Sequence, residues 1–359
     1  MRLPPIQGLV EARRSFLPDA VAVDGTVNDS LFCEVFPNMD MVIALLPALF
    51  LGATGIITTL IGGKAVQGTL GMTYGAVIFG LGLMLVYVVP NAGWDYALNP
   101  RIWVVGLFSG LFWAVGSAGQ FTAMKQIGVT LAIPLSTAGQ IVTNALMAAL
   151  VLGEWNTGRM WLFGLISVAL VCVGALCTSV QDKSEEQGVQ QVPKSQFTAG
   201  LVSVAISTLG FMLYFVFPNL LSKIGYISDD VHDAPNGTGV HYMTAVIAPQ
   251  SIGMLAGALL IVLFVAKEPS LIVEKHTFLN MITGVVWAIG NVLIFISCAN
   301  PNIGQAVATT FSQLNVIVAV LGGILILHEK RTRRQLWFIA LGTLFIAAGA
   351  VLMGNLGVL

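Results

Sequence analysis

The sequence has little charge. Only 9% of its 359 residues are Asp, Glu, Lys or Arg, whereas 56% are hydrophobic. A soluble domain carries about 25% charged residues. So few charges cannot cover a surface that faces water, and the sequence therefore predicts an integral membrane protein. The net charge of −1 carries no information about partners, and we expect no nucleic acid among them.

The motifs of several enzyme classes are missing. Neither a GxxxxGK[ST] phosphate loop nor an HExxH zinc-protease motif occurs in the chain. Its four cysteines lack the spacing of a metal site or a disulfide framework. Three of them lie in apolar runs, where packing is their expected role. We therefore expect no cofactor, no metal and no enzyme activity.

One acidic cluster keeps an enzyme class open. Asp229, Asp230 and Asp233 have the DDxxD shape with which prenyl-transfer enzymes hold Mg²⁺ on a diphosphate. That chemistry needs a second acidic cluster and basic residues around a shared cavity, and the sequence shows neither. An intramembrane prenyl-transfer enzyme is the alternative from a different functional class.

Long apolar runs fill most of the chain. A bilayer core is crossed by about 20 mainly apolar residues in a helix. The runs that reach this length lie at 41–60, 70–90, 102–124, 127–152, 159–178, 198–222, 241–266, 278–299, 303–328 and 335–355. The predicted fold is an all-α integral membrane protein with ten transmembrane helices.

Two polar segments divide the sequence. Residues 1–38 have no apolar run of spanning length, and we expect a disordered tail or a misassigned start. The polar linker 179–196 lies between the fifth and sixth spans. It separates a first five-helix repeat at 39–178 from a second five-helix repeat at 197–359.

A long repeat relates these two segments. Trp113 pairs with Trp287, and Gly116 pairs with Gly290, at the same separation along the chain. Because five is an odd number, the second half enters the membrane from the opposite side, and the topology of the two halves is inverted. Inverted repeats are common in secondary transporters, whose substrate site lies near the middle of the bilayer where the halves meet.

The cations indicate an orientation. Ten Lys and Arg residues lie in odd-numbered loops between the spans, and three lie in even-numbered loops. Cytoplasmic loops carry an excess of Lys and Arg. The odd-numbered loops are therefore expected in the cytoplasm, and both termini outside.

Neutral polar groups, rather than charged ones, occupy the spans. Buried charges mark proton relays and ion sites, so their absence argues against a pump built on a buried carboxylate and against a charged substrate. In the third, fourth, eighth and ninth spans, amides, hydroxyls and tryptophans recur at helical spacing, which places them on one helix face. The candidate substrate-binding residues are Trp113, Ser117, Gln120, Ser136, Gln140, Asn144, Trp287, Asn291, Gln305, Thr309, Ser312 and Gln313.

These groups suit a neutral solute with many hydroxyls, because an amide both donates and accepts hydrogen bonds. For any one of them the alternative is a hydrogen bond between helices. The two tryptophans have core packing as their alternative. Glu154 and Glu329, which close the fourth and ninth spans, are expected to be solvated caps and loop anchors, with gating as the alternative.

Three segments resemble a known family: Met39–Lys64, Ser207–Asn219 and Gly304–Arg334. They are similar to the bacterial glucose/ribose sugar-uptake porters, a branch of the drug/metabolite transporter superfamily, and the resemblance covers 39–359. It implies a ten-helix sugar permease of the cytoplasmic membrane, driven by the proton gradient.

Together these observations predict a multi-pass permease in the lipid bilayer that takes up a neutral monosaccharide, of glucose or ribose type, by alternating access. Protons are the expected coupling ion. An exporter of another small metabolite is the alternative within the same superfamily, since a fold does not determine a substrate.

Overall fold

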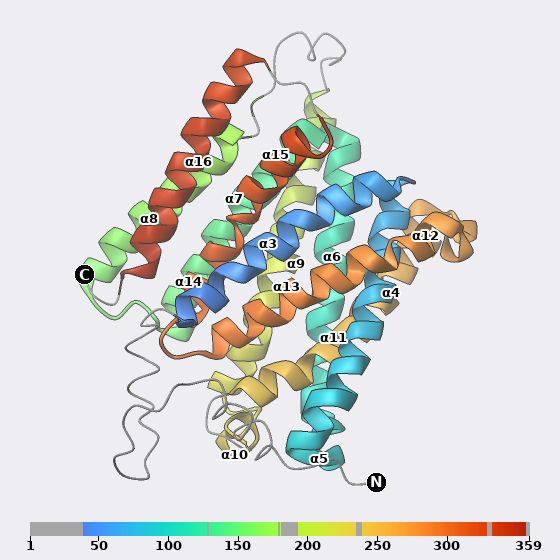
Figure 1. The fold of residues 1–359 in the computed structure, drawn as a ribbon, viewed down its shortest axis with the longest axis vertical. Coiled ribbons are helices and arrows are strands. Elements are labelled where there is room, and N and C mark those ends of the chain that lie inside the picture. The colour runs from blue at the N-terminus through green and yellow to red at the C-terminus, as the bar shows by residue number, and fades with distance from the viewer. Residues whose placement is uncertain are drawn as a thin grey trace, which may run out of the picture. The chain divides into compact units, whose positions relative to one another are not determined.

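The chain forms a bundle of α-helices in the computed structural model, which describes residues 39–127, 129–178, 180, 193–234, 239–328 and 332–356 (Figure 1). The expected tail at 1–38, most of the linker at 179–196, and Glu329 lie outside the described residues. Residues Asp40–Leu359 belong to one compact unit.

Ten helices among the described residues are long and apolar enough to cross a membrane, and they coincide with the ten predicted spans. The all-α membrane fold is thus confirmed. In chain order the spans are built from α3 (Met39–Ile61), α4 (Ala65–Leu83) with η1 (Met84–Val88) and α5 (Val89–Ala97), α6 (Pro100–Ile127), α7 (Val129–Met147) with η2 (Ala148–Leu152), α8 (Gly158–Thr178), α9 (Lys194–Lys223), α11 (Val240–Leu260) with η4 (Ile261–Ala266), α12 (Lys275–Leu279) with α13 (Met281–Ala299), α14 (Gly304–Ser312) with α15 (Asn315–Leu325), and α16 (Arg333–Gly354). Two short helices, α10 (Asp229–His232) and η5 (Pro269–Val273), lie in loops.

Polar contacts between loops define two ends of the bundle. At the Glu154 end, where α8 and α14 begin and α9 ends, Glu154 accepts hydrogen bonds from the first turn of α14. There too, Arg101 donates to the carbonyl of Tyr226 at 3.2 Å. At the Lys64 end, where α4 and α9 begin and α3 and α8 end, Lys64 pairs with Glu268. The contacts at the Glu154 end join even-numbered loops, and the contact at the Lys64 end joins odd-numbered loops. Consecutive helices that cross the membrane in alternating directions require this grouping.

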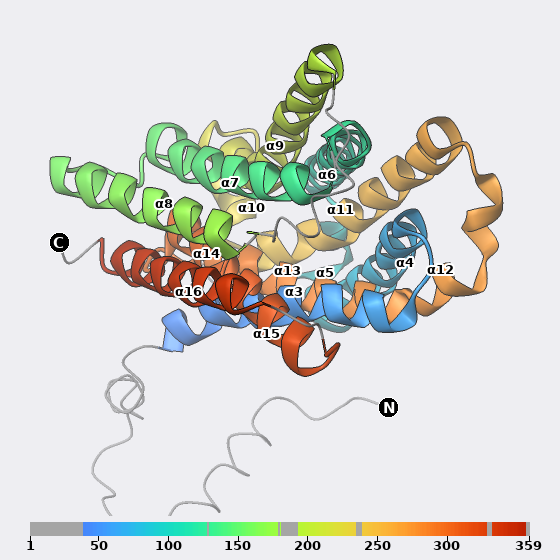
Figure 2. The same ribbon diagram turned by 90° about the horizontal axis from the view of Figure 1, so that it is seen from above.

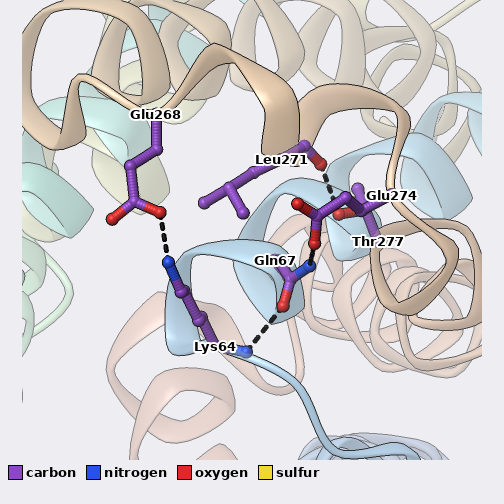
Figure 3. A network of polar contacts seen from close by, with 6 residues as sticks. All are labelled: Lys64, Gln67, Glu268, Leu271, Glu274 and Thr277. Atoms are coloured by element: carbon purple, nitrogen blue, oxygen red, sulfur yellow. Dashed lines mark hydrogen bonds and ion pairs between the residues drawn. The ribbon is translucent and has the colours of Figure 1, made fainter.

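The turn at the Lys64 end contains two glycines, and Lys64 and Gln67 beside it join a network of polar contacts (Figure 3). Gly62 and Gly63 have φ of 76° and 97°, a conformation that glycine adopts without strain. Gln67, which is buried, accepts from the backbone N–H of Lys64 at 2.7 Å and donates to Glu274 at 2.5 Å. The hydrogen bond to Glu268 raises the pKa of Lys64. Since the Lys64 side chain is 60% exposed, water screens this pair and it stabilises the end only weakly.

Glycines bring pairs of helices into backbone contact. A Cβ on Gly110 of α6 would lie 2.1 Å from the carbonyl oxygen of Gln250 in α11. A Cβ on Gly284 of α13 would lie 2.2 Å from the carbonyl oxygen of Met72 in α4. Small residues allow such an approach, and dispersion at short range is a main source of helix association in lipid. Gly110 and Gly284 each lie three residues before the paired tryptophans, so both halves use the same contact.

The outer helices pair across the repeat as well. α8 and α16, the last spans of the two halves, lie side by side in both views (Figures 1 and 2). α4 packs against α11 away from this pair. These pairs are the ones that a two-fold relation between the halves would produce, and the inversion of the halves across the membrane stays a prediction.

Replacing Gly110 tests the glycine contact. In Gly110→Val the new side chain must push α6 away from α11, and overpacking of this kind costs about 1–3 kcal/mol or more. We expect a lower midpoint of thermal unfolding in detergent. Gly55→Val in α3 is the matched control, since nothing lies within 4 Å of its added Cβ. Equal midpoints for the two variants would contradict the contact.

Candidate functional site

A cavity of about 390 Å³ lies in the middle of the bundle. Small-molecule sites have volumes of about 300–1,000 Å³, so it is large enough for one small solute. Every lining side chain that the structure describes is neutral. The lining residues are Leu51, Thr54, Trp113, Thr137, Gln140, Ala175, Phe211, Tyr214, Phe215, Trp287, Ser312, Gln313, Asn315, Val316, Ala319 and Val320.

Aromatic rings form one wall of this cavity. Trp113 and Trp287, the paired tryptophans of the two halves, meet edge to face with ring centroids 6.0 Å apart. Phe211 lies 6.5 Å from Trp113, and Tyr214 lies 6.4 Å from Trp287. Edge-to-face and tilted packing at these distances is favourable. The wall therefore joins α6, α9 and α13 and offers the cavity a rigid apolar surface.

A buried hydrogen-bond network holds Tyr214. Its hydroxyl donates to the side-chain oxygen of Asn291 in α13. Asn291 donates to Gln250 at 3.1 Å, Gln250 donates to Ser109 at 2.8 Å, and Ser109 donates to the backbone carbonyl of Tyr214 at 2.8 Å. The ring of bonds spans α6, α9, α11 and α13. Because the hydroxyl is engaged in this network, Tyr214 contributes its aromatic ring to the cavity.

Polar side chains also line the cavity, and the ninth span is broken beside two of them, Ser312 and Gln313. The backbone N–H groups of Gln313 and Leu314 bond three residues back, at 3.1 and 3.0 Å, which is the tighter 3₁₀ pattern. The hydroxyl of Ser312 donates to the carbonyl of Thr309 at 2.7 Å, a local bond that bends helices. The break separates α14 from α15. Interrupted helices are a feature of transporter substrate sites.

Five of the predicted residues line the cavity: Trp113, Gln140, Trp287, Ser312 and Gln313. Two others, Ser136 and Asn291, form hydrogen bonds with residues that line the cavity. Ser136 bonds Ser207 at 3.1 Å between α7 and α9 and accepts from Gln140 at 3.2 Å. Asn291 belongs to the Tyr214 network.

The other predicted residues lie outside the lining. Ser117 is buried and Gln120 is half-buried in α6. Thr309 donates to the carbonyl of Gln305 at 2.7 Å. Their part in binding stays a prediction.

Two of the predicted residues are buried amides with unpaired atoms. Both side-chain polar atoms of Asn144 lack a hydrogen-bond partner, as does the amide nitrogen of Gln305. Leaving a buried donor or acceptor unpaired costs about 1–3 kcal/mol. Only the side-chain oxygen of Gln305 is bonded, at 2.6 Å to the amide of Asn219 in α9.

Sequence reasoning missed the contributions of the first and sixth spans. Thr54 comes from α3, whereas Phe211, Tyr214 and Phe215 come from α9. Thr137 and Asn315, which were not among the candidates, also line the cavity. The internal repeat could have indicated these contributions. In it the first and sixth spans are partners, as are the third and eighth and the fourth and ninth, whose residues were predicted.

Glu154 links the fourth span to the ninth. Gly153, with φ of 74°, turns the chain after η2. The Glu154 carboxylate then accepts from the backbone N–H groups of Gln305 at 2.5 Å and Ala306 at 2.8 Å. Negative charge is stabilised at a helix N-terminus. Glu154 is therefore a cap, as expected, although it is half-buried rather than solvated.

The surroundings of Glu154 act on its pKa in opposite directions. Burial raises the pKa above its ordinary value of 4.5, and this is the larger effect. The two backbone hydrogen bonds and the nearby charge of Lys223 lower it. The ammonium of Lys223 itself donates to the carbonyl of Leu152.

Comparison with known proteins decides the family. The chain matches the family described as "Sugar transport protein" over residues 42–356. It belongs to this family. A "Putative sugar uptake protein" of Lactiplantibacillus plantarum is 35% identical over 317 residues, covering 87% of this chain and 98% of the relative. The "Glucose uptake protein GlcU" of Bacillus subtilis is 34% identical, covering 88% and 98%. A solved structure with 15% identity and a TM-score of 0.60, covering 88% of this chain and 96% of its own, shares the fold.

Membership of the sugar transport protein family confirms the resemblance seen in the sequence. Its described part has ten helices of the membrane-spanning type, and the chain is a multi-pass protein of the cell membrane. The relatives are named as uptake proteins, which places the chain among transporters and not enzymes.

The aspartates at 229–233 do not support the enzyme alternative. Asp229 and Asp230 begin the short helix α10, and Asp233 pairs with His232 at 2.7 Å. Within the part of the chain that the structure describes, no group of three His, Cys, Asp or Glu residues could hold a metal ion.

Tyr214→Phe separates the two roles of Tyr214. The variant leaves Asn291 and Gln250 without the hydroxyl, so we expect a lower unfolding midpoint, equivalent to about 1–3 kcal/mol. Sugar uptake by vesicles should persist, because the ring that lines the cavity remains. Tyr226→Phe, at an exposed tyrosine of the Glu154 end, is the control. An unchanged midpoint, or lost uptake in a folded variant, would contradict this assignment.

Proposed function

We propose that this chain is a secondary-active permease that takes up a neutral monosaccharide, of glucose or ribose type, across the cytoplasmic membrane. Transport proceeds by alternating access and is coupled to protons. The two five-helix halves, 39–178 and 197–359, move against each other around the cavity.

The observation that carries this proposal is the chemistry of the cavity. Its described lining is neutral and joins an aromatic wall to amides and hydroxyls. A monosaccharide has apolar C–H faces and hydroxyls that both donate and accept, so the aromatic and the polar lining residues complement the two kinds of sugar surface. The relatives named as glucose uptake proteins support the same substrate class.

Five cavity residues are proposed to contact the sugar. Trp113 and Trp287 provide the apolar surface, and Gln140 of the fourth span and Gln313 of the ninth span provide amides. The hydroxyl proton of Ser312 is engaged with Thr309, which leaves its oxygen to accept from the sugar. Among the described carboxyl groups, Glu154 is the one whose pKa burial raises, and this suits it to exchange a proton.

A substrate panel in proteoliposomes tests the function. Glucose, ribose and other neutral sugars are supplied as radiolabelled solutes, with and without an imposed pH gradient. We expect saturable uptake of at least one monosaccharide and faster uptake when the outside is acidic. Efflux of another metabolite without sugar uptake would favour the exporter. Uptake that ignores the pH gradient would remove proton coupling.

Gln140→Ala and Gln313→Ala test the binding residues. Each variant removes an amide from the cavity, so we expect uptake to fall about tenfold, as loss of one hydrogen bond of about 1.4 kcal/mol would produce. Membrane expression should be unchanged. Gln196→Ala is the matched control, because its amide bonds the carbonyl of Gln126 at the Lys64 end. Loss of expression together with activity would identify the amide as a link between helices.

A further inference from the structure

Three amides lie between the cavity and the Glu154 end. Asn144 is one turn beyond Gln140 on the same face of α7, and Gln305 is two turns from Gln313 along the ninth span. Asn219 is one turn beyond Phe215 in α9. Each lies on the Glu154 side of a cavity-lining residue, and α7 packs against both α9 and α14.

Two of the three amides have polar atoms without a hydrogen-bond partner in this conformation. Asn144 is 1% exposed with both polar atoms unpaired, and Gln305 is fully buried with its amide nitrogen unpaired. Asn219 donates to the oxygen of Gln305 at 2.6 Å. Buried polar groups without partners are rare in folded proteins and call for an explanation. Hydroxyls of a sugar, which donate and accept, would supply the missing partners.

Short contacts close the Glu154 end over these amides. Glu154 holds the first turn of α14 through the N–H groups of Gln305 and Ala306. Lys223 of α9 holds the carbonyl of Leu152 at the end of the fourth span. Together these contacts join α7 with η2, α9 and α14, the helices that carry the three amides.

The cavity extends toward the other end. Thr54 and Ala175 lie in the parts of α3 and α8 that are closer to the Lys64 end, and Val320 lies in the part of the ninth span, Gly304–Leu325, that is closer to it. At that end the Lys64–Glu268 pair is exposed and weak. The structure thus has a cavity on one side and closed amides on the other, as an alternating-access protein has in one of its two states.

We propose that Asn144, Asn219 and Gln305 form a second binding segment for the hydroxyls of the same neutral sugar, opened when Glu154 leaves the first turn of α14. This inference rests on the proposed function and extends it. Glu154 acts as the latch of a gate. Its release lets α14 move from η2 and connects the three amides to the Glu154 end.

Cysteine alkylation tests the gate without a transport assay. In a chain whose Cys33, Cys172, Cys177 and Cys298 are replaced by alanine, Asn144→Cys is treated with a water-soluble maleimide in detergent. We expect slow alkylation with Glu154 intact and a rate several-fold higher when Glu154→Ala is added. Under the same treatment, Thr137→Cys, which reports on the cavity, should react faster than Asn144→Cys while Glu154 is intact.

Glu268→Ala is the matched control, because it removes a glutamate from the Lys64 end and should leave the rate at Asn144→Cys unchanged. Size-exclusion chromatography establishes which variants are folded. Glu154→Gln, which loses the charge but keeps one acceptor oxygen, replaces Glu154→Ala if the latter is misfolded. If Asn144→Cys is alkylated no faster in the folded Glu154 variant than in the Glu268→Ala control, the proposed gate is overturned.

Glucose added to the Glu154 variant tests the binding segment. Bound sugar should slow alkylation of Asn144→Cys, whereas mannitol at the same concentration should not. If glucose is transported by the unaltered chain but does not slow alkylation, the amides are not a binding segment. If glucose is not transported, the proposed substrate fails, and the effect of Glu154 on alkylation still decides the gate.

Discussion

The structure depends on backbone contact between helices at paired glycines. Gly110 sets α6 against α11, and Gly284 sets α13 against α4, each so close that a single methyl group would meet a carbonyl oxygen. Lipid provides no hydrophobic force that would push these helices together, so the fold relies on contact distance and polar bonds. The next pair of glycines continues the pattern, because Gly116 packs on Phe211 of α9 and Gly290 packs on Phe50 of α3. Helices α6 and α13 are thereby each held against two neighbouring helices.

These contacts determine where the cavity can lie. Trp113 and Trp287 follow Gly110 and Gly284 by three residues, and the centroids of the two indole rings lie 6.0 Å apart. The Tyr214 network then ties the same helices together on the far side of the wall. Because this aromatic wall is supported by buried hydrogen bonds, the movement proposed above is assigned to the broken ninth span and the loop at Glu154.

Much of the fold could be predicted because its signals are local. Apolar runs of spanning length and the spacing of the paired tryptophans need no knowledge of neighbours. The site could be predicted only in part, because helix-face spacing does not say what the face meets. Asn291 lies one turn from Trp287, yet its amide bonds Gln250 and Tyr214, whereas Gln313 reaches the cavity. The contribution of α9 was missed because Phe211 and Phe215 are apolar and read as lipid-facing or core residues in any single span.

One face of α7 shows why polarity alone is a poor guide to binding. Ser136, Gln140 and Asn144 follow one another at a spacing of one turn, and each has a different environment. Ser136 is satisfied by Ser207, Gln140 lines the cavity, and Asn144 has no partner. A satisfied group stabilises the conformation in which it is seen. An unsatisfied one destabilises that conformation and favours any other in which it is paired. In the proposed alternating-access cycle, such a residue would lower the barrier to leaving this state, and the missing partner of Asn144 is consistent with that proposal.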